Sequence, residues 1–358
     1  MNHPTEPLGA EGAAHPELPL PRGPRKGSTV TSPTAPRPVP ERRTIIVRPT
    51  RSDRAFVLGA RASAVGTLAV MGLIGTFLLV GAMPALKSQG WSFLTEHEWL
   101  PEANQFGIAA LLWGTILIGL FALVVAVPVA LGAALFISEY APRSLKKPLI
   151  TLVDLMAAVP AVIYAIWALF FLQEHLLTVA EWLSVHLGTW LPFMTVQVPD
   201  SPSSYTSSAF IAGMAVGVVV LPTMTSVMRE VFSQAPIGER EGAIALGATR
   251  WGMIRTVVLP FGRAGIIGGV MLGLGRALGE TIVVYALISP MFDFTTHPFE
   301  SGTNAIAAHI ASRYSESGGV ALAGLLGAGL VLFGFTLVIN TLAGIVVSRS
   351  RSGAATEI

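Results

Sequence analysis

Six long apolar stretches dominate this 358-residue sequence, near residues 62–86, 108–138, 148–172, 207–232, 264–290 and 320–347. Each is long enough to cross about 30 Å of hydrocarbon as a helix of about 20 residues. Only 12% of the residues are charged, against about 25% in soluble domains. A soluble fold has too few polar groups to cover so much apolar surface. The pattern predicts an all-α integral membrane protein whose six transmembrane helices occupy residues 56–350.

The Lys and Arg residues between these stretches are unevenly distributed. Thirteen lie in four segments: residues 51–61 just before the first stretch, the connection between the second and third, residues 229–263 from the end of the fourth to the start of the fifth, and the residues after the sixth. The alternate connections carry two, Lys87 and Arg313. Because basic residues concentrate on the cytoplasmic side of membrane proteins, the sequence predicts that both termini are cytosolic.

Two segments outside the apolar stretches have a distinct composition. Residues 1–55 hold eleven of the 25 prolines and predict a disordered, proline-rich cytosolic tail. A lipid-headgroup or regulatory contact by the basic residues 42–61 is the alternative. Within residues 173–206, apolar residues recur at helical spacing from Leu176 to Leu187. They predict a helix that either lies at the outer membrane interface or packs on its own protein.

The sequence lacks the residues that catalysis would need. It has no cysteine, which excludes disulfides, thiolate nucleophiles and Cys-based metal sites. It contains no Gly-Lys pair and therefore no phosphate-binding P-loop. The histidines are scattered rather than spaced as metal ligands. The sequence therefore predicts no catalytic residue, no metal site and no cofactor in this chain.

The segment between the fourth and fifth stretches, residues 236–260, has the features of a docking site. Glu239 to Leu246 predicts a short helix with small residues, and Gly247 is placed to end it as a C′ glycine. The residues after it carry Arg250, Trp251 and Arg255. Small residues on an exposed helix let another surface approach closely.

The spacing in this segment resembles the "EAA" loop of ABC importer permeases. Glu241-Gly242-Ala243 is followed by three residues and Gly247, then by nine residues, Val257, one residue and Leu259-Pro260. The resemblance implies that a cytosolic ATPase, which binds ATP and Mg²⁺ itself, receives this short helix in a groove. It further implies that Glu241, Gly242, Ala243, Gly247, Leu259 and Pro260 couple the chain to that ATPase. The other interpretation is an ordinary helical hairpin.

The fifth apolar stretch contains two charges, Arg276 and Glu280, followed by Thr281. Each charge near the bilayer centre costs about 2.5–3.5 kcal/mol on insertion scales, so partners or a water-filled path are expected. Four residues apart on one helix, the two side chains can pair. They form either a buried ion pair that only locks helices, or an anion site. Arginine suits phosphate because its planar fork donates parallel hydrogen bonds.

Residues 268–281 resemble the signature of PstC-type permeases of phosphate-importing ABC transporters. Similar matches occur at Phe93-Leu94, Glu98-Trp99, Pro101, Phe106-Gly107, Ser138–Pro142 and Ala158–Tyr164, where Ala161 replaces the usual serine. The resemblance implies a type I ABC importer permease that forms half of a phosphate path through Arg276, Glu280 and Thr281. It also implies a second homologous permease, an ATPase dimer, an extracytoplasmic phosphate-binding protein and the bacterial inner membrane, with no nucleic acid. We hypothesise that Glu280 neutralises Arg276 until phosphate takes over the arginine.

Three other functions are alternatives to phosphate import. The same architecture could carry another oxyanion, such as sulfate or molybdate. An ion-coupled secondary transporter predicts an inverted repeat and no docking loop. A membrane-embedded sensor has no direct support in the residues.

Pro128, Pro160 and Pro222 predict kinks within the apolar stretches. Thr115 and Tyr164 are candidates for lining a polar path or for packing between helices. Asp154, near the cytosolic end of the third stretch, is either an interfacial residue or part of a gate.

Overall fold

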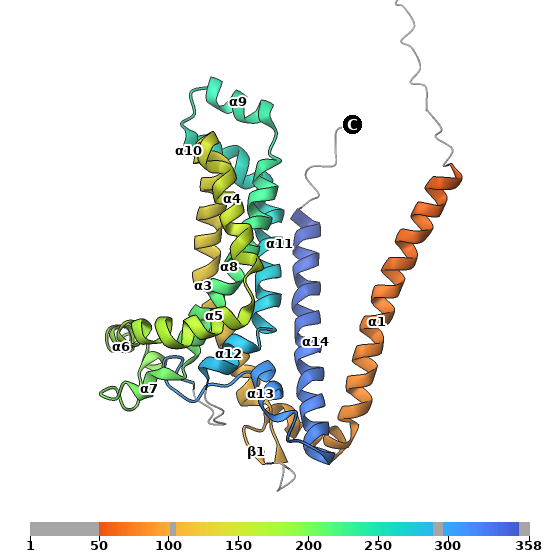
Figure 1. The fold of residues 1–358 in the computed structure, drawn as a ribbon, viewed down its shortest axis with the longest axis vertical. Coiled ribbons are helices and arrows are strands. Elements are labelled where there is room, and N and C mark those ends of the chain that lie inside the picture. The colour runs from red at the N-terminus through yellow and green to blue at the C-terminus, as the bar shows by residue number, and fades with distance from the viewer. Residues whose placement is uncertain (1–49, 101–104, 289–295, 351–358) are drawn as a thin grey trace, which may run out of the picture. The chain divides into compact units, whose positions relative to one another are not determined.

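The computed structural model describes residues 50–100, 105–288 and 296–350, and these residues are mainly helical (Figure 1). The predicted proline-rich tail lies outside the described residues up to position 49, and helix α1 begins at Arg51. The elements are α1 (Arg51–Gln89), α2 (Ser92–Thr95), β1 (Trp99–Leu100), β2 (Gln105–Phe106), α3 (Ala109–Leu135), η2 (Phe136–Tyr140), α4 (Arg143–Ala158), α5 (Ala161–Trp167), η3 (Ala168–Leu172), α6 (Gln173–Gly188), η4 (Pro192–Met194), α7 (Ser203–Thr206), α8 (Ala209–Ser233), α9 (Ile237–Ala245), α10 (Arg250–Met253), η5 (Ile254–Val258), α11 (Leu259–Leu278), α12 (Ile282–Leu287), α13 (Ile306–Arg313) and α14 (Gly319–Ser350).

Six helical segments of the described chain are long and apolar enough to cross a membrane. They are Arg51–Gln89, Ala109–Tyr140, Ala161–Gly188, Ala209–Ser233, Arg250–Leu278 and Gly319–Ile345. The predicted number of spans is therefore confirmed. Two positions differ from the prediction: the third segment lies further along the chain than 148–172, and the fifth begins earlier and ends earlier than 264–290.

The third apolar stretch is divided by a break at Val159–Pro160, between α4 and α5. Pro160 has no N–H to offer the carbonyl of Met156, which the Tyr164 hydroxyl reaches instead at 2.8 Å. Beyond the break, α6 runs crosswise to α8 and α11 (Figure 1). Pro128 and Pro222 behave differently, because each lies inside a continuous helix, α3 and α8.

The predicted helix within residues 173–206 is present as α6. One stripe of it is buried against the protein, at Leu176, Ala180, Ser184 and Gly188. On other faces Val179, Trp182 and Val185 are exposed. The interpretation that this helix packs on its own protein is confirmed. Its position at the outer membrane interface stays a prediction, and the exposed apolar side chains of α6 are compatible with it.

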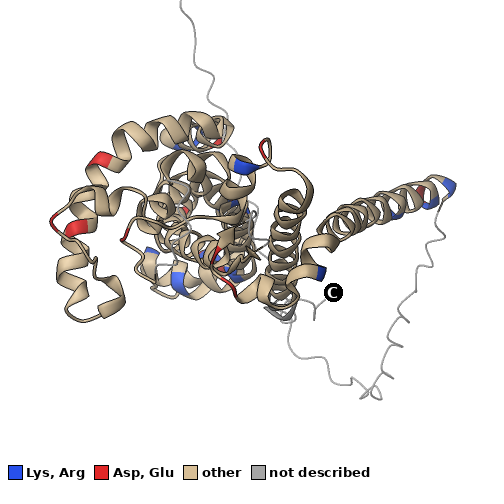
Figure 2. Ribbon diagram, turned by 90° about the horizontal axis from the view of Figure 1, so that it is seen from below, with Lys and Arg blue, Asp and Glu red and all other residues tan. Residues whose placement is uncertain are grey.

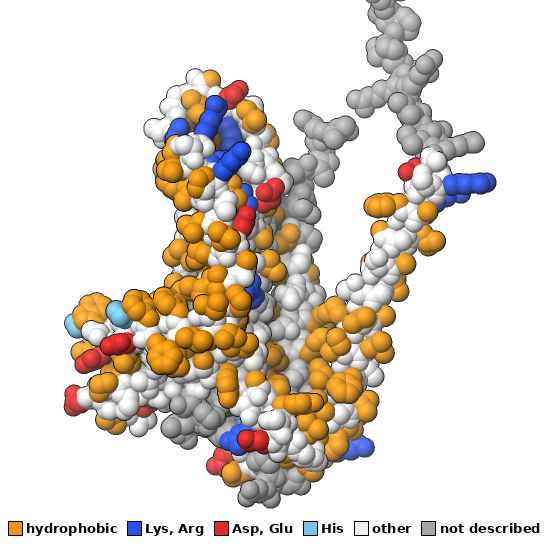
Figure 3. Space-filling view, viewed as in Figure 1, with side chains coloured by type: hydrophobic (Ala, Val, Ile, Leu, Met, Phe, Trp, Pro, Cys, Tyr) orange, Lys and Arg blue, Asp and Glu red, His pale blue; other side chains and the backbone are white. Residues whose placement is uncertain are grey.

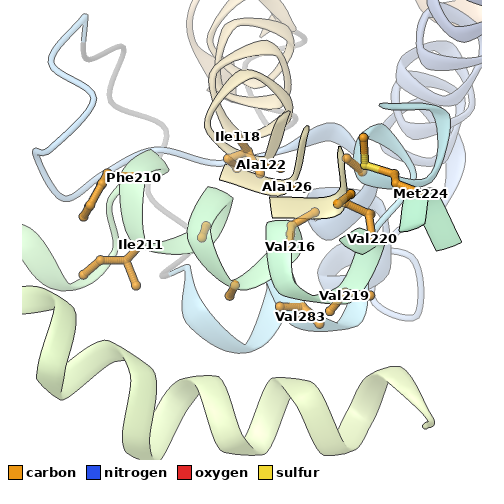
Figure 4. Close-up of a cluster of buried hydrophobic side chains, with 14 of the residues drawn as sticks. Ile118, Ala122, Ala126, Phe210, Ile211, Val216, Val219, Val220, Met224 and Val283 are labelled. Atoms are coloured by element: carbon orange, nitrogen blue, oxygen red, sulfur yellow. The ribbon is translucent and has the colours of Figure 1, made fainter. Parts of the chain in front are cut away.

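The core forms where α3 packs along α8 (Figure 4). Alanines four residues apart, Ala122, Ala126, Ala130 and Ala134, form one buried stripe of α3. Opposite them, a Cβ on Gly213 would lie 2.9 Å from the Ile118 carbonyl oxygen, and one on Gly217 would lie 3.1 Å from that of Ala122. Without a hydrophobic drive inside lipid, such close backbone contact supplies the van der Waals attraction that holds helices together.

Helix α11 packs on α8 through a second row of small residues. A Cβ on Gly262, Gly265 or Gly273 would lie 2.4–2.5 Å from Phe232, Val231 or Met224. For Gly269 the distance to Met228 would be 3.1 Å. Gly269 and Gly273, four residues apart in the fifth apolar stretch, therefore let α11 approach α8 closely.

Charged residues are sparse along the ribbon (Figure 2). On the face in Figure 3, Lys and Arg side chains gather at the end of the bundle that carries α9 and α10, and apolar side chains cover the face beyond them. Leu152, Leu155, Ile163 and Phe170 are among the exposed large apolar residues. Exposed apolar surface of this extent is typical of contact with lipid or with other subunits.

Candidate functional site

The fifth apolar stretch is a discontinuous helix. Helix α11 ends at Leu278, α12 begins at Ile282, and Gly279, Glu280 and Thr281 connect them outside either helix. The prediction of one continuous helix over 264–290 is wrong at this point, and residues 289 and 290 lie outside the described chain. Irregular backbone at membrane depth is tolerated where it is buried in protein or lines a cavity.

Arg276 lies in the last turn of α11, where a positive charge interacts favourably with the helix dipole. Its Nη1 donates a hydrogen bond of 3.0 Å to Oγ1 of Thr223 on α8. Arg276 also lines a groove of about 530 Å³ between α11 and α14. The other polar side chains of this groove are Thr336 and Asn340, four residues apart on α14.

Glu280 and Thr281 bond to the backbone around the helix break. The carboxylate Oε1 of Glu280 accepts from the N–H of Val283 at 3.4 Å, in the first turn of α12. The Thr281 hydroxyl donates to the Gly279 carbonyl at 3.1 Å. Neither side chain lines the groove that contains Arg276.

The predicted pair between Arg276 and Glu280 is not formed. In the part of the chain that the structure describes, the one ion pair within 4.0 Å joins Arg240 and Glu139. The physical reason is the helix break, because residues four apart share a face only while the helix continues. Two hypotheses required a contact between Arg276 and Glu280: an ion pair that locks helices, and a competition in which phosphate displaces Glu280. The structure does not show that contact. Arg276 holds no carboxylate partner among the described residues.

Three polar residues near Arg276 were not singled out from the sequence: its partner Thr223 and the groove residues Thr336 and Asn340. Each is a polar side chain within a long apolar stretch, and that is the signal that could have identified them. Two of the candidates that were singled out are satisfied elsewhere. Thr115 accepts from the N–H of Ile306 at 3.0 Å, and Asp154 accepts from Ser226 at 3.3 Å.

The predicted docking helix is present as α9, and Gly247 ends it as predicted. Gly247 has a φ of +88°, a left-handed conformation in which glycine has no steric cost. Its N–H donates to Ile244 at 2.9 Å, and the N–H of Ala248 donates to Ala243 at 3.1 Å. These two bonds form a Schellman motif. Thr249 then caps α10 by accepting from the N–H of Gly252 at 3.1 Å.

The second half of segment 236–260 is helical rather than a loop. From Arg250, the chain runs through α10 and the π-helical η5 into α11 without interruption. Leu259 and Pro260 are the first residues of α11, and Pro260, which has no N–H to donate, lies directly after the π-helical η5. A single helical segment, Arg250–Leu278, therefore leads from the docking helix to Arg276.

The outward face of α9 has no partner within the described chain. Glu241 and Gly242 are exposed, Ala243 is half-buried, and Leu246 is 92% exposed. No atom lies within 4 Å of a Cβ built on Gly242. The helix thus presents small and apolar residues to its surroundings at the basic end of the bundle (Figure 3).

The family model described as the inner membrane component of binding-protein-dependent transport systems matches residues 126–352, which include α9, α11 and the groove. This chain belongs to that family. It is 38% identical over 307 residues to the phosphate transport system permease protein PstC 2 of Mycobacterium tuberculosis, covering 85% of this chain and 94% of that one. It is 37% identical over 278 residues to PstC of Haemophilus influenzae, covering 76% and 86%. A crystal structure of a bacterial ABC transporter that imports the polysaccharide alginate aligns with a TM-score of 0.55, 19% identity, and coverage of 85% and 97%.

Membership of the family decides the class of the protein. It is a multi-pass membrane component of a transport system that includes a binding protein, and it is not an enzyme. The predicted permease architecture is confirmed by the family and by the fold of the alginate transporter. An ion-coupled secondary transporter, the alternative from another class, is not favoured.

Proposed function

We propose that this chain is one permease subunit of an ATP-driven importer of inorganic phosphate in the bacterial inner membrane. The single observation that carries the proposal is Arg276, which lines an intramembrane groove without a carboxylate partner among the described residues. The relatives reported above, which are phosphate permeases by name, support the choice of anion.

In this proposal, phosphate passes along the groove and takes hydrogen bonds from Arg276. The guanidinium is oriented by Thr223, so it can offer its remaining N–H donors to phosphate oxygens in a fixed direction. Glu280 is held by α12 rather than by Arg276, so it does not compete for the arginine. We assign Glu280 and Thr281, in the break between α11 and α12, to a later part of the path, where the carboxylate would repel the anion and limit its residence.

The energy for transport comes from outside the chain. We assign α9 with Glu241, Gly242, Ala243 and Gly247, together with Leu259 and Pro260 where α11 begins, to the contact with a cytosolic ATPase that binds ATP and Mg²⁺. The other partners are a second homologous permease, a second ATPase copy and an extracytoplasmic phosphate-binding protein. The asymmetry of the Lys and Arg residues supports cytosolic termini.

Uptake of radiolabelled phosphate by cells that depend on this chain tests the assignment of Arg276. Arg276→Gln removes the charge and is expected to lower uptake by about tenfold to a hundredfold, since charged hydrogen bonds contribute about 1.5–3 kcal/mol each. Arg263→Gln is the matched control, because Arg263 is exposed on the same helix and does not line the groove. Undiminished uptake in Arg276→Gln would refute the path. Uptake of sulfate in place of phosphate by the wild type would refute the substrate.

A further inference from the structure

The docking helix α9 is joined by an ion pair to η2, the π-helical turn that follows α3, although the two residues are 101 positions apart. Nη1 of Arg240 lies 3.2 Å from Oε1 of Glu139 and donates to Oε2 at 3.3 Å. Nη2 of the same guanidinium donates to the carbonyl of Phe232 near the end of α8. One side chain at the start of α9 therefore connects the ends of α3 and α8.

This pair is shielded from solvent. The Glu139 side chain is 4% exposed and that of Arg240 is 19% exposed. Exposed ion pairs contribute little to stability, but removing one member of a buried pair leaves an uncompensated charge and is strongly unfavourable. Separating α9 from the end of α3 therefore costs more free energy than breaking an exposed ion pair would.

A second contact reinforces the first. The guanidinium of Arg250 lies 5.7 Å from the centre of the Tyr140 ring, within the range of a cation–π interaction. Tyr140 is the neighbour of Glu139 in η2. On the other side, Lys146 of α4 donates to the Ser138 carbonyl at 3.4 Å. The segment η2 is thus held by side chains from α4, α9 and α10.

Both helices that the docking segment reaches have a π-helical turn at the point of contact. The η2 turn ends α3, and the η5 turn precedes α11. Helix α9 also packs against η5. Single π turns occur frequently at functional sites, where the wider hydrogen-bond ring perturbs the regular helix. Movement of α9 therefore has a covalent route into α11 and a side-chain route into α3.

We propose that the Glu139–Arg240 ion pair, supported by Arg250 over Tyr140, is a coupling strut through which the docking helix moves α3 together with α11. The inference rests on the proposed function, since it requires that an ATPase acts on α9. Because α3 packs closely along α8, the strut links the docking helix to the helix that carries Thr223. Glu139 and Arg240 are positioning residues and contact no substrate.

The strut is tested in the transporter purified with its own ATPase and reconstituted with the phosphate-binding protein. Phosphate taken up and ATP hydrolysed are measured together. Glu139→Gln is expected to lower the uptake per ATP by about fivefold or more, a typical size for coupling between sites, while the ATPase stays bound. Arg240→Gln is expected to do the same. The double variant is expected to be no worse than either single variant, because the two residues act as one pair.

Glu230→Gln is the matched control, because it neutralises an exposed carboxylate near the end of α8, outside the docking helix, and should leave the ratio unchanged. A wild-type ratio in Glu139→Gln, or additive losses in the double variant, would overturn the strut. If the glutamine variants fail to assemble, Glu139→Asp keeps the charge but shortens the reach. Its ratio is expected to fall about threefold, and a wild-type ratio would again overturn the strut. A wild-type complex that imports no phosphate would instead overturn the proposed function.

Discussion

Thr223 controls how the guanidinium of Arg276 is presented to the groove. Thr223→Val removes the hydroxyl that accepts from Nη1 and keeps the branched shape of the side chain. The expected result is an increase of about tenfold in KM for phosphate uptake, because one hydrogen bond to a charged group contributes about 1.5 kcal/mol or more. Thr223→Ser keeps the acceptor and should retain the wild-type KM in the same uptake assay. Equal KM values for the valine and serine variants would argue against this role.

His309 gives the protein a dependence on pH. Its side chain is fully buried in α13, and burial together with the charge of Arg313 lowers its pKa from 6.5 to about 4. Because the folded pKa is depressed for a base, the unfolded chain binds the proton more tightly between these values. The free energy of unfolding is therefore highest, as far as His309 is concerned, above pH 6.5. It decreases as the pH falls toward 4, by about 3 kcal/mol at most.

Thermal melting of the detergent-solubilised protein from pH 7 to pH 4.5 measures this effect. His309→Phe keeps an aromatic ring against Trp99, whose ring centre lies 4.7 Å from that of His309. We expect the Tm of the wild type to fall more steeply with decreasing pH than the Tm of His309→Phe. Parallel curves would show that another group is responsible.

Single residues also show what a sequence can reveal about this site. Arg276 was predictable, because a charge within an apolar stretch needs a reason to be there. Its partner was not, because Thr223 lies 53 positions away on another helix. Local spacing favoured Glu280 as the partner, and that prediction failed where the helix ends at Leu278.

At the scale of the element, the shape of the docking helix depends on the turn that ends it. Gly247→Ala places a Cβ at a φ of +88°, which costs about 1–2 kcal/mol for residues other than glycine. We expect the Schellman turn to be weakened and the amount of ATPase that co-purifies to fall severalfold. Gly238→Ala is the control within α9, since no atom lies within 4 Å of the added Cβ and alanine favours a helix. Equal ATPase recovery from both variants would contradict the prediction.

The elements that local chemistry specifies were predicted well. The six apolar stretches, the break at Pro160 and the end of α9 at Gly247 each have a clear residue signal. The break between α11 and α12 has a weak one, because no proline is present and Gly279 is only one of many glycines in that stretch. The turns η2 and η5 have no signal that could be read from residue type. They are stabilised by contacts between distant segments, including the pair between Glu139 and Arg240.

At the scale of the whole molecule, one helical segment connects the docking helix with the groove. Helices α10, η5 and α11 run continuously from Arg250 to Leu278, and α9 joins this segment through the short turn at residues 246–249. Glycines of α11 hold this segment close to α8 along its length. We therefore expect a displacement at α9 to change the position of Arg276 relative to Thr223.

The direction of this transmission requires α9 to face the cytosol, and that orientation can be tested directly because the chain contains no cysteine. Leu246→Cys places a single thiol at a fully open position beside α9, and Thr189→Cys places one just after α6, also exposed. The excess of Lys and Arg around α9 predicts that it is cytosolic. In cells whose outer envelope is permeable but whose inner membrane is intact, a membrane-impermeant maleimide should label Thr189→Cys. It should label Leu246→Cys only after the inner membrane is permeabilised. The reverse pattern would place the docking helix outside the cell, out of reach of any ATPase, and would overturn the coupling scheme together with the orientation.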